Sequence, residues 1–158
     1  PKSQRGPSCL GVASRWKNTD GTNLACFLRV GGDHQFSGPA MKTNRVFKSA
    51  ECMQPSEDEP IRSVVVESTE AVVVAWYVKP GQSIAAHVHP AGQDTWTILS
   101  GRGKYQVEIS GETRDVVAGD IVVACTGCVH GVYNNGTEPL RFVSVVSPAG
   151  AGYELARG

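Results

Sequence analysis

The sequence predicts an all-β fold, an antiparallel barrel or two-sheet sandwich, preceded by a polar N-terminal arm. Between residues 61 and 147, short runs rich in Val, Ile, Thr and aromatic residues follow one another at close spacing, which is typical of strands. Eighteen glycines and nine prolines are spread through the chain and supply turns. Helical periodicity is nearly absent, which favours an antiparallel sheet architecture over a mixed fold.

The N-terminal arm is predicted to occupy residues 1–60. Its first 25 residues are polar and show no sustained period. One or two added strands are expected in the arm. RVFKSAE (45–51) is a candidate strand, LACFLRV (24–30) is a short apolar run, and MQPSEDEP (53–60) has the composition of an acidic linker. The barrel then takes residues 61–158, in a chain whose 158 residues suit one core.

The barrel strands follow from alternating turn and β-rich segments. Lys79-Pro80-Gly81 breaks one run, and Ser110-Gly111-Glu112 is predicted to form a hairpin tip. The tail PAGAGYELARG is expected to be extended or a short helix. The predicted strands are residues 61–68, 70–78, 83–89, 94–100, 103–110, 113–117, 121–125, 129–134 and 140–147.

Two histidines within the run GQSIAAHVHPAGQDTWTILSG indicate half of a metal site. His87 and His89 are two residues apart, and alternation along a strand points both to one face. A third histidine, His130, follows in the second half of the chain, and a barrel can bring it beside the first two. Three neutral imidazoles and one oxygen donor suit Mn, Fe, Ni, Zn or Cu.

Two spaced sets of residues resemble the two sequence motifs of the cupin family. The first is Gly81-x5-His87-x-His89-x4-Asp94-x6-Gly101. The second is Gly119-x5-Cys125-x-Gly127-x2-His130-x3-Asn134. The resemblance implies a double-stranded β-helix (jelly-roll) barrel with a metal near its mouth, and a homodimer. It covers residues 81–134 and does not extend to residues 1–44.

The fourth metal ligand stays open between two neighbours. The family usually has Glu here, and this chain has Gln93-Asp94. Counting forward from His89 selects Gln93, whereas counting back from Gly101 selects Asp94. Strand parity favours Asp94, because the aromatic and aliphatic residues that follow it would then also face inward.

The five cysteines, an odd number, favour reduced thiols in a reducing compartment. Cys125-Thr-Gly-Cys128 is formally a C-x-x-C, for which small residues filling a turn is the favoured interpretation. Cys128 shares strand parity with His130, so its thiol is a candidate nucleophile or acid beside the metal. The chain also resembles a subgroup of small bacterial cupins that includes the manganese-dependent methylthioxylulose-5-phosphate methylsulfurylase. That resemblance implies Mn and a pocket cysteine, Cys128 or Cys125, that accepts sulfur.

These observations predict a cytoplasmic metal-dependent enzyme for a small oxygenated metabolite, such as a sugar phosphate, working by enolisation, lyase or methylsulfurylase chemistry. One divalent transition metal is expected, with Mn favoured over Fe, Ni or Zn. Two alternatives stay open: an Fe-dependent dioxygenase and a non-catalytic small-molecule-binding protein. A net charge of zero argues against a nucleic-acid partner, and no apolar run is long enough to span a membrane.

Overall fold

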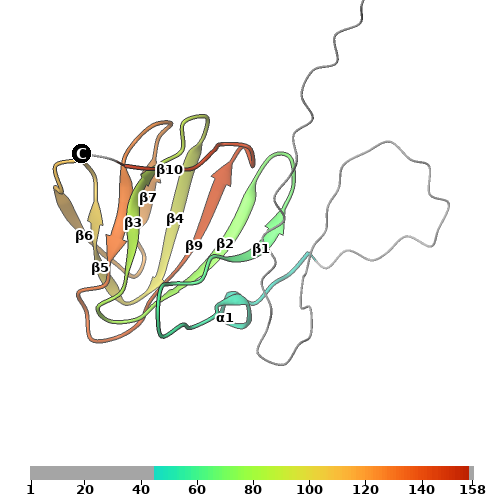
Figure 1. Cartoon of the computed structure of the whole chain (residues 1–158). Helices are drawn as coiled ribbons and strands as arrows, with labels where there is room; N and C mark the ends of the chain where they lie inside the picture. Colours follow the sequence, from blue (N-terminus) through green and yellow to red (C-terminus); the bar gives the residue numbers. More distant parts are fainter. Residues whose placement is uncertain (1–44, 157–158) are drawn as a thin grey trace, which may run out of the picture.

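The computed structural model describes residues 45–156, and these residues form two five-stranded sheets packed face to face (Figure 1). All pairings between neighbouring strands are antiparallel. The first sheet has the order β1 (Ser63–Glu67), β2 (Val72–Val78), β9 (Leu140–Ser147), β4 (Gln93–Ser100), β7 (Ile121–Ala124). The second has the order β10 (Glu154–Leu155), β3 (Ser83–Val88), β8 (His130–Tyr133), β5 (Arg102–Gln106), β6 (Thr113–Val117).

This arrangement confirms the predicted all-β jelly roll, and each barrel strand lies within its predicted range or begins one residue earlier. The main length difference is β5, which ends at Gln106 rather than at residue 110. Val107 already donates its N–H to the carbonyl of Glu112, so residues 107–112 form the hairpin connection. The tail is extended at its end, where β10 pairs with β3.

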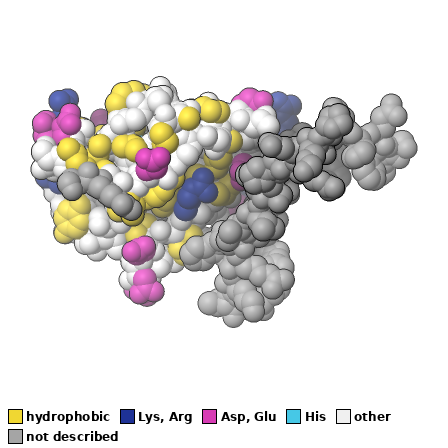
Figure 2. All heavy atoms as spheres, turned by 45° about the horizontal axis from the view of Figure 1, so that its top comes forward, with side chains coloured by type: hydrophobic (Ala, Val, Ile, Leu, Met, Phe, Trp, Pro, Cys, Tyr) yellow, Lys and Arg dark blue, Asp and Glu magenta, His cyan; other side chains and the backbone are white. Residues whose placement is uncertain are grey.

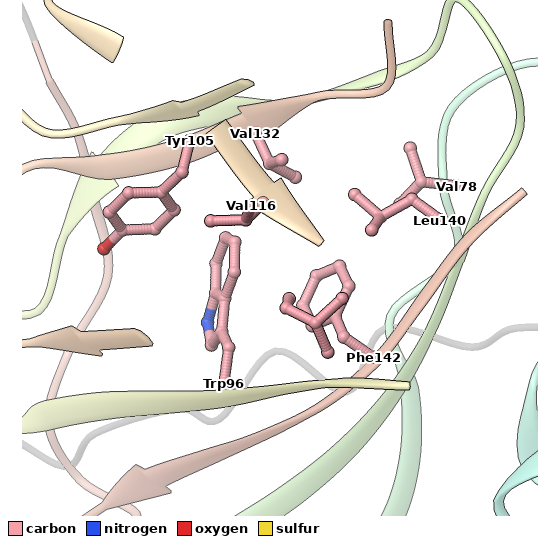
Figure 3. Packing of buried hydrophobic residues seen from close by; sticks show 8 residues of the cluster. Val78, Trp96, Tyr105, Val116, Val132, Leu140 and Phe142 are labelled. Carbon is pink, nitrogen blue, oxygen red and sulfur yellow. The ribbon is translucent and has the colours of Figure 1, made fainter. Parts of the chain in front are cut away.

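The barrel core is aromatic and aliphatic, and it is filled from alternate positions of both sheets. Trp96 is nearly fully buried; its ring stacks on Phe142 at 4.5 Å between centroids and meets Tyr105 edge-on at 5.3 Å (Figure 3). Along β4 the residues that face this core are Asp94, Trp96 and Ile98, which confirms the parity that favoured Asp94. Asp94, a candidate metal ligand, therefore shares one strand face with the hydrophobic core.

A second apolar cluster covers the outer face of β1 and β2. Met53 and Phe47 flank a one-turn helix, α1 (Ser49–Cys52), and pack on Val65 and Ala75. The expectation of a strand at 45–51 was therefore wrong. This segment lies across the sheet face instead of extending its edge, and Ala50 and Glu51 are good helix formers. The short apolar run LACFLRV (24–30) lies outside the described residues.

The outer face of β4, β7 and β9 carries exposed apolar side chains. Thr95 pairs with Val123 on one side and with Val145 on the other, and Thr97 pairs with Ile121. Ile121 and Val123 are 68% and 56% exposed. Hydrophobic patches between scattered charges are also visible on the face that Figure 2 shows. Within residues 45–156, no helix has the length and hydropathy that crossing a membrane requires.

Candidate metal centre

Four buried side chains, His87, His89, Asp94 and His130, converge between the two sheets. One potential ligand atom from each lies within 4.8 Å of the others. The three imidazole centroids are 4.0 to 5.2 Å apart. Nitrogen ligands at about 2.1 Å from one ion lie up to about 4.2 Å apart, so small side-chain movements would close this set around a metal. Three nitrogens and a carboxylate form a donor set that suits a divalent transition metal.

A β-bulge on β3 turns the histidines inward. Ile84 packs against the barrel core, so strict alternation would point His87 to the outside. The register between β3 and β8 shifts by one residue between Ile84 and His87, and His87 then pairs directly with His130. Gly131 makes room at this point, because a Cβ there would lie 2.8 Å from the Ile84 carbonyl oxygen. The bulge and the glycine together place two imidazoles side by side.

Each imidazole is oriented by a backbone carbonyl. Nδ1 of His87 lies 2.8 Å from the Ala85 carbonyl oxygen, and Nδ1 of His130 lies 3.0 Å from that of Cys128. Nδ1 of His89 contacts the Gly152 carbonyl oxygen. A carbonyl oxygen only accepts hydrogen bonds, so each neutral ring carries its proton on Nδ1. The three Nε2 atoms are then left with lone pairs for a metal, the outer-shell pattern usual for metal-binding histidines.

Asp94 supplies negative charge to the centre. Its Oδ2 accepts a 2.7 Å hydrogen bond from Trp96 Nε1 and lies 3.6 Å from His130 Nε2 and 3.7 Å from His89 Nε2. Burial alone would raise the pKa of this carboxyl group. The contacts with His130, His89 and Trp96 outweigh burial and hold the pKa well below its ordinary value. Asp94 is therefore ionised at neutral pH.

The pKa values of His87, in β3, and His89, just after β3, are shifted in opposite directions. Burial lowers the pKa of His87 from 6.5 to about 4, and repulsion from His130 and His89 adds to this effect. Contact with Asp94 raises the pKa of His89 despite its burial. His87 is thus neutral and available to a metal at neutral pH. At His89, whose pKa is raised, protons compete with a metal for the imidazole.

Two buried atoms of the centre make no hydrogen bond among the described residues. They are Oδ1 of Asp94 and Nε2 of His130. An unpartnered buried polar atom costs on the order of 1–3 kcal/mol, and a metal ion would satisfy both. The donor set and these orphaned atoms therefore fit a divalent metal.

Gln93 does not join this group. It is exposed at the start of β4, and its Nε2 donates to the Thr95 hydroxyl at 2.9 Å. Side chains alternate along a strand, so only one of the neighbours Gln93 and Asp94 can face the barrel interior. The structure brings Asp94 and not Gln93 together with the three histidines.

Cys125 and Cys128 form a disulfide in this structure, with 5.2 Å between their Cα atoms. The expectation of reduced thiols is therefore wrong for this pair, whereas Cys52 is free. The catalytic role predicted for Cys128 needs a thiol, so it stays a prediction for the reduced protein. The pair lies beside the centre, because His130 Nδ1 donates to the Cys128 carbonyl.

Two residues of the C-terminal tail join the site without having been predicted. The Gly152 carbonyl contacts His89, and the Tyr153 ring lies 4.7 Å from the His87 ring and 6.3 Å from the His89 ring. Tyr153 is 58% exposed, so the histidines lie one ring away from solvent here. Pairing of β10 with β3 brings the tail to the centre, and nothing in the local sequence predicted that pairing.

An open groove of about 410 Å³ lies at the edge where β6 and β7 face each other. None of the four converging residues lines it, so the groove is separate from the candidate metal centre. Its inner wall includes Tyr105, which packs on Trp96. The lining residues are Tyr105, Val107, Arg114, Asp115, Val116, Asp120, Ile121, Val122 and Val123.

Residues 74–146 match the family model of the cupin domain. A solved Klebsiella pneumoniae protein, described as an uncharacterized conserved protein with a double-stranded beta-helix domain, is 51% identical. The match covers 73% of this chain and 99% of that protein, with a TM-score of 0.70. The chain belongs to the cupin superfamily.

More distant cupins share the fold alone. An RmlC-like cupin from Desulfovibrio desulfuricans is 21% identical over 69% of this chain and 98% of its own, with a TM-score of 0.57. The polyketide cyclase RemF from Streptomyces resistomycificus is 18% identical over 64% and 73%, with a TM-score of 0.56. No curated protein matches this cupin significantly.

Proposed function

We propose that this cupin is a divalent-metal-dependent enzyme that acts on a small oxygenated metabolite. One observation carries the proposal: three imidazoles oriented with free Nε2 lone pairs and an ionised carboxylate meet in a buried position, and two of their polar atoms make no hydrogen bond among the described residues. His87, His89, Asp94 and His130 would hold the metal. A metal held there supplies Lewis-acid chemistry, which polarises a substrate carbonyl or hydroxyl oxygen.

The protein side chains around the centre support small-molecule chemistry. Burial, reinforced by the charge of Glu59, raises the pKa of Tyr153, so its hydroxyl keeps its proton at neutral pH. This hydroxyl, on the exposed side of the His87 ring, is a donor for a substrate oxygen. The Trp96 ring lies 5.8 Å from the His130 ring and is backed by Phe142, and these buried aromatic residues exclude water and strengthen electrostatic interactions in the centre.

Sulfur transfer of the methylsulfurylase kind is not part of the proposal. Such chemistry needs a thiol as sulfur acceptor, and the sulfurs of Cys125 and Cys128 are bonded to each other. Enolisation and lyase reactions need only a polarised carbonyl and a group that moves a proton. The proposed substrate class is therefore a small hydroxy- or oxo-compound, such as a sugar phosphate.

The test begins with metal analysis of purified protein and matched variants. We expect about one equivalent of a divalent metal in the wild type and in Gln93→Ala, with loss of metal in Asp94→Ala and in His87→Ala. Gln93 is the matched control, since it is exposed and adjacent to Asp94. Equal metal content in the wild type and both site variants would refute the site.

Activity assays then separate the reaction classes. Substrate-dependent oxygen uptake by the iron-loaded protein would identify it as a dioxygenase and would refute enolisation or lyase chemistry. Metal-dependent turnover of a sugar phosphate without oxygen uptake, lost in Asp94→Ala, would support the proposal. Full metal binding without turnover of any small oxygenated compound in a substrate panel would favour a binding protein instead.

A further inference from the structure

The turn between β7 and β8 contains the disulfide that the proposed metal chemistry does not use. Cys125-Thr126-Gly127-Cys128 is a tight turn, closed by a 2.8 Å hydrogen bond from the Cys128 N–H to the Cys125 carbonyl. Gly127 occupies the third position with φ of +72°, which favours glycine. This turn holds the two cysteine Cα atoms 5.2 Å apart, within the range that a disulfide needs.

The same turn touches the environment of three of the four converging residues. The Gly127 N–H donates to the His89 carbonyl at 2.9 Å, and the Cys128 carbonyl accepts from Nδ1 of His130 at 3.0 Å. On the other side, Cys125 directly follows Ala124, which pairs with Asp94 across the ladder. The C-x-x-C turn therefore supplies one backbone hydrogen-bond partner to each of two histidine residues, His89 and His130.

The disulfide is also accessible. Cys125, Thr126 and Gly127 are exposed, and Cys128 is half-buried. A thiol reagent can reach the Cys125 sulfur without opening the barrel. Outer-shell groups that orient metal-binding histidines typically change metal affinity by 10- to 100-fold when they are disturbed.

We propose that Cys125–Cys128 is a redox modification site, exchanged with a dithiol reductant, whose oxidation state sets the metal affinity of the adjacent centre. The metal-affinity part rests on the proposed metal binding. The oxidised pair fixes the Cα of Cys128, the residue whose carbonyl accepts the hydrogen bond from His130. Reduction removes the covalent constraint and leaves only one backbone hydrogen bond to close the turn, so the oxidised form binds metal more tightly.

The dithiol reductant supplies the two electrons and two protons that reduce the disulfide. A thiolate of the dithiol attacks the Cys125 sulfur, the bond between the two cysteines breaks, and the Cys128 sulfur takes up a proton. The second thiol of the reductant then displaces Cys125, which also becomes a thiol. The reductant leaves as a cyclic disulfide, having given two electrons and two protons to the protein.

The test compares two redox states of the full chain. Metal-free protein is oxidised or reduced with dithiothreitol and freed of reagent without air. Mass spectrometry after alkylation of the peptide that contains residues 125–128 reports its redox state. Mn²⁺ affinity is measured from the signal of the free ion. We expect complete reduction under native conditions and a Kd about tenfold higher in the reduced form.

A second readout needs no metal. The Nδ1–H resonance of His130 in metal-free protein should shift on reduction, because its acceptor is the Cys128 carbonyl. The Cys125→Ser/Cys128→Ser variant should bind Mn²⁺ like the reduced wild type under both conditions. Cys52→Ser, which removes a free cysteine at the end of α1, should keep the redox response.

The outcomes separate the two proposals. Resistance of the disulfide to reduction, or equal Mn²⁺ affinity and an unchanged His130 resonance in both states, would overturn the redox proposal and leave the metal centre standing. Absence of Mn²⁺ binding in both states would overturn the proposed function, and the metal-affinity part with it. The wild-type comparison requires no substitution, so a variant that fails to fold does not affect it.

Discussion

Acid should destabilise the metal-free protein through His87. Its imidazole is 5% exposed, and burial lowers its pKa from 6.5 to about 4. Above about pH 6.5 the ring is neutral in both the folded and unfolded states and contributes nothing. Between about pH 6.5 and about pH 4 the unfolded chain binds a proton that the folded chain refuses. The full difference in pKa corresponds to about 3 kcal/mol of lost unfolding free energy.

His89 works in the opposite direction. Contact with Asp94 raises its pKa, so its protonation contributes stability that is present below its unfolded pKa and lost as pH rises through the folded pKa. The change in unfolding free energy of the wild type with pH therefore contains contributions from both histidines. The contribution of His87 is isolated by His87→Phe, which keeps an aromatic ring that does not titrate.

The assay is chemical denaturation of chelator-treated protein between about pH 7.5 and about pH 4. We expect the wild type to lose about 3 kcal/mol more than His87→Phe over this interval. His89→Phe should lose more than the wild type, because a stabilising protonation is removed. If the wild type and His87→Phe lose the same free energy at every pH, the ring is not kept neutral by burial, and the reasoning fails.

Three further predictions concern packing around the centre and the outer surface. Trp96→Phe removes the indole donor to Asp94 and should cost about 1.5–3 kcal/mol by denaturation at neutral pH, a loss that shrinks as Asp94 protonates in acid. Gly131→Ala should cost about 1–3 kcal/mol and raise the metal Kd about tenfold in calorimetry, because its Cβ would push the β3 bulge and His87 away. If the chain is a homodimer through the exposed apolar face, as its resemblance implied, Ile121→Lys should halve the mass measured by light scattering, and an unchanged dimer would exclude that face.

The strands and the converging residues were predictable because their signals are local. Alternating apolar runs and Gly-containing turns fix most strand positions within a few residues, and the spacing of His87, His89 and His130 selects the imidazoles. The choice between Gln93 and Asp94 stayed open because counting from His89 and from Gly101 gave different answers. Strand parity predicted that Asp94 and not Gln93 faces the barrel interior, since a strand face is set by packing on the core.

The disulfide was not predicted, because its cause is geometric. An odd number of cysteines favours free thiols when only composition is considered. The tight turn at Gly127 brings Cys125 and Cys128 together, and that geometry depends on how β7 leads into β8. The helix at α1 was missed for a related reason, since packing on the outer face of β1 and β2 overrides a weak local preference.

The orientation of the three imidazoles depends on irregular backbone segments, which is why the sequence did not predict it. Each histidine hydrogen-bonds to a carbonyl of a different irregular segment: His87 to the β3 bulge, His89 to the C-terminal tail and His130 to the C-x-x-C turn. Regular strands place the imidazoles, but these three carbonyls fix the tautomers and aim the Nε2 atoms. Bulges, turns and tails have no periodic sequence signal. The identity of the converging residues is therefore readable from the sequence, whereas the orientation that would let them bind a metal is a property of the folded chain.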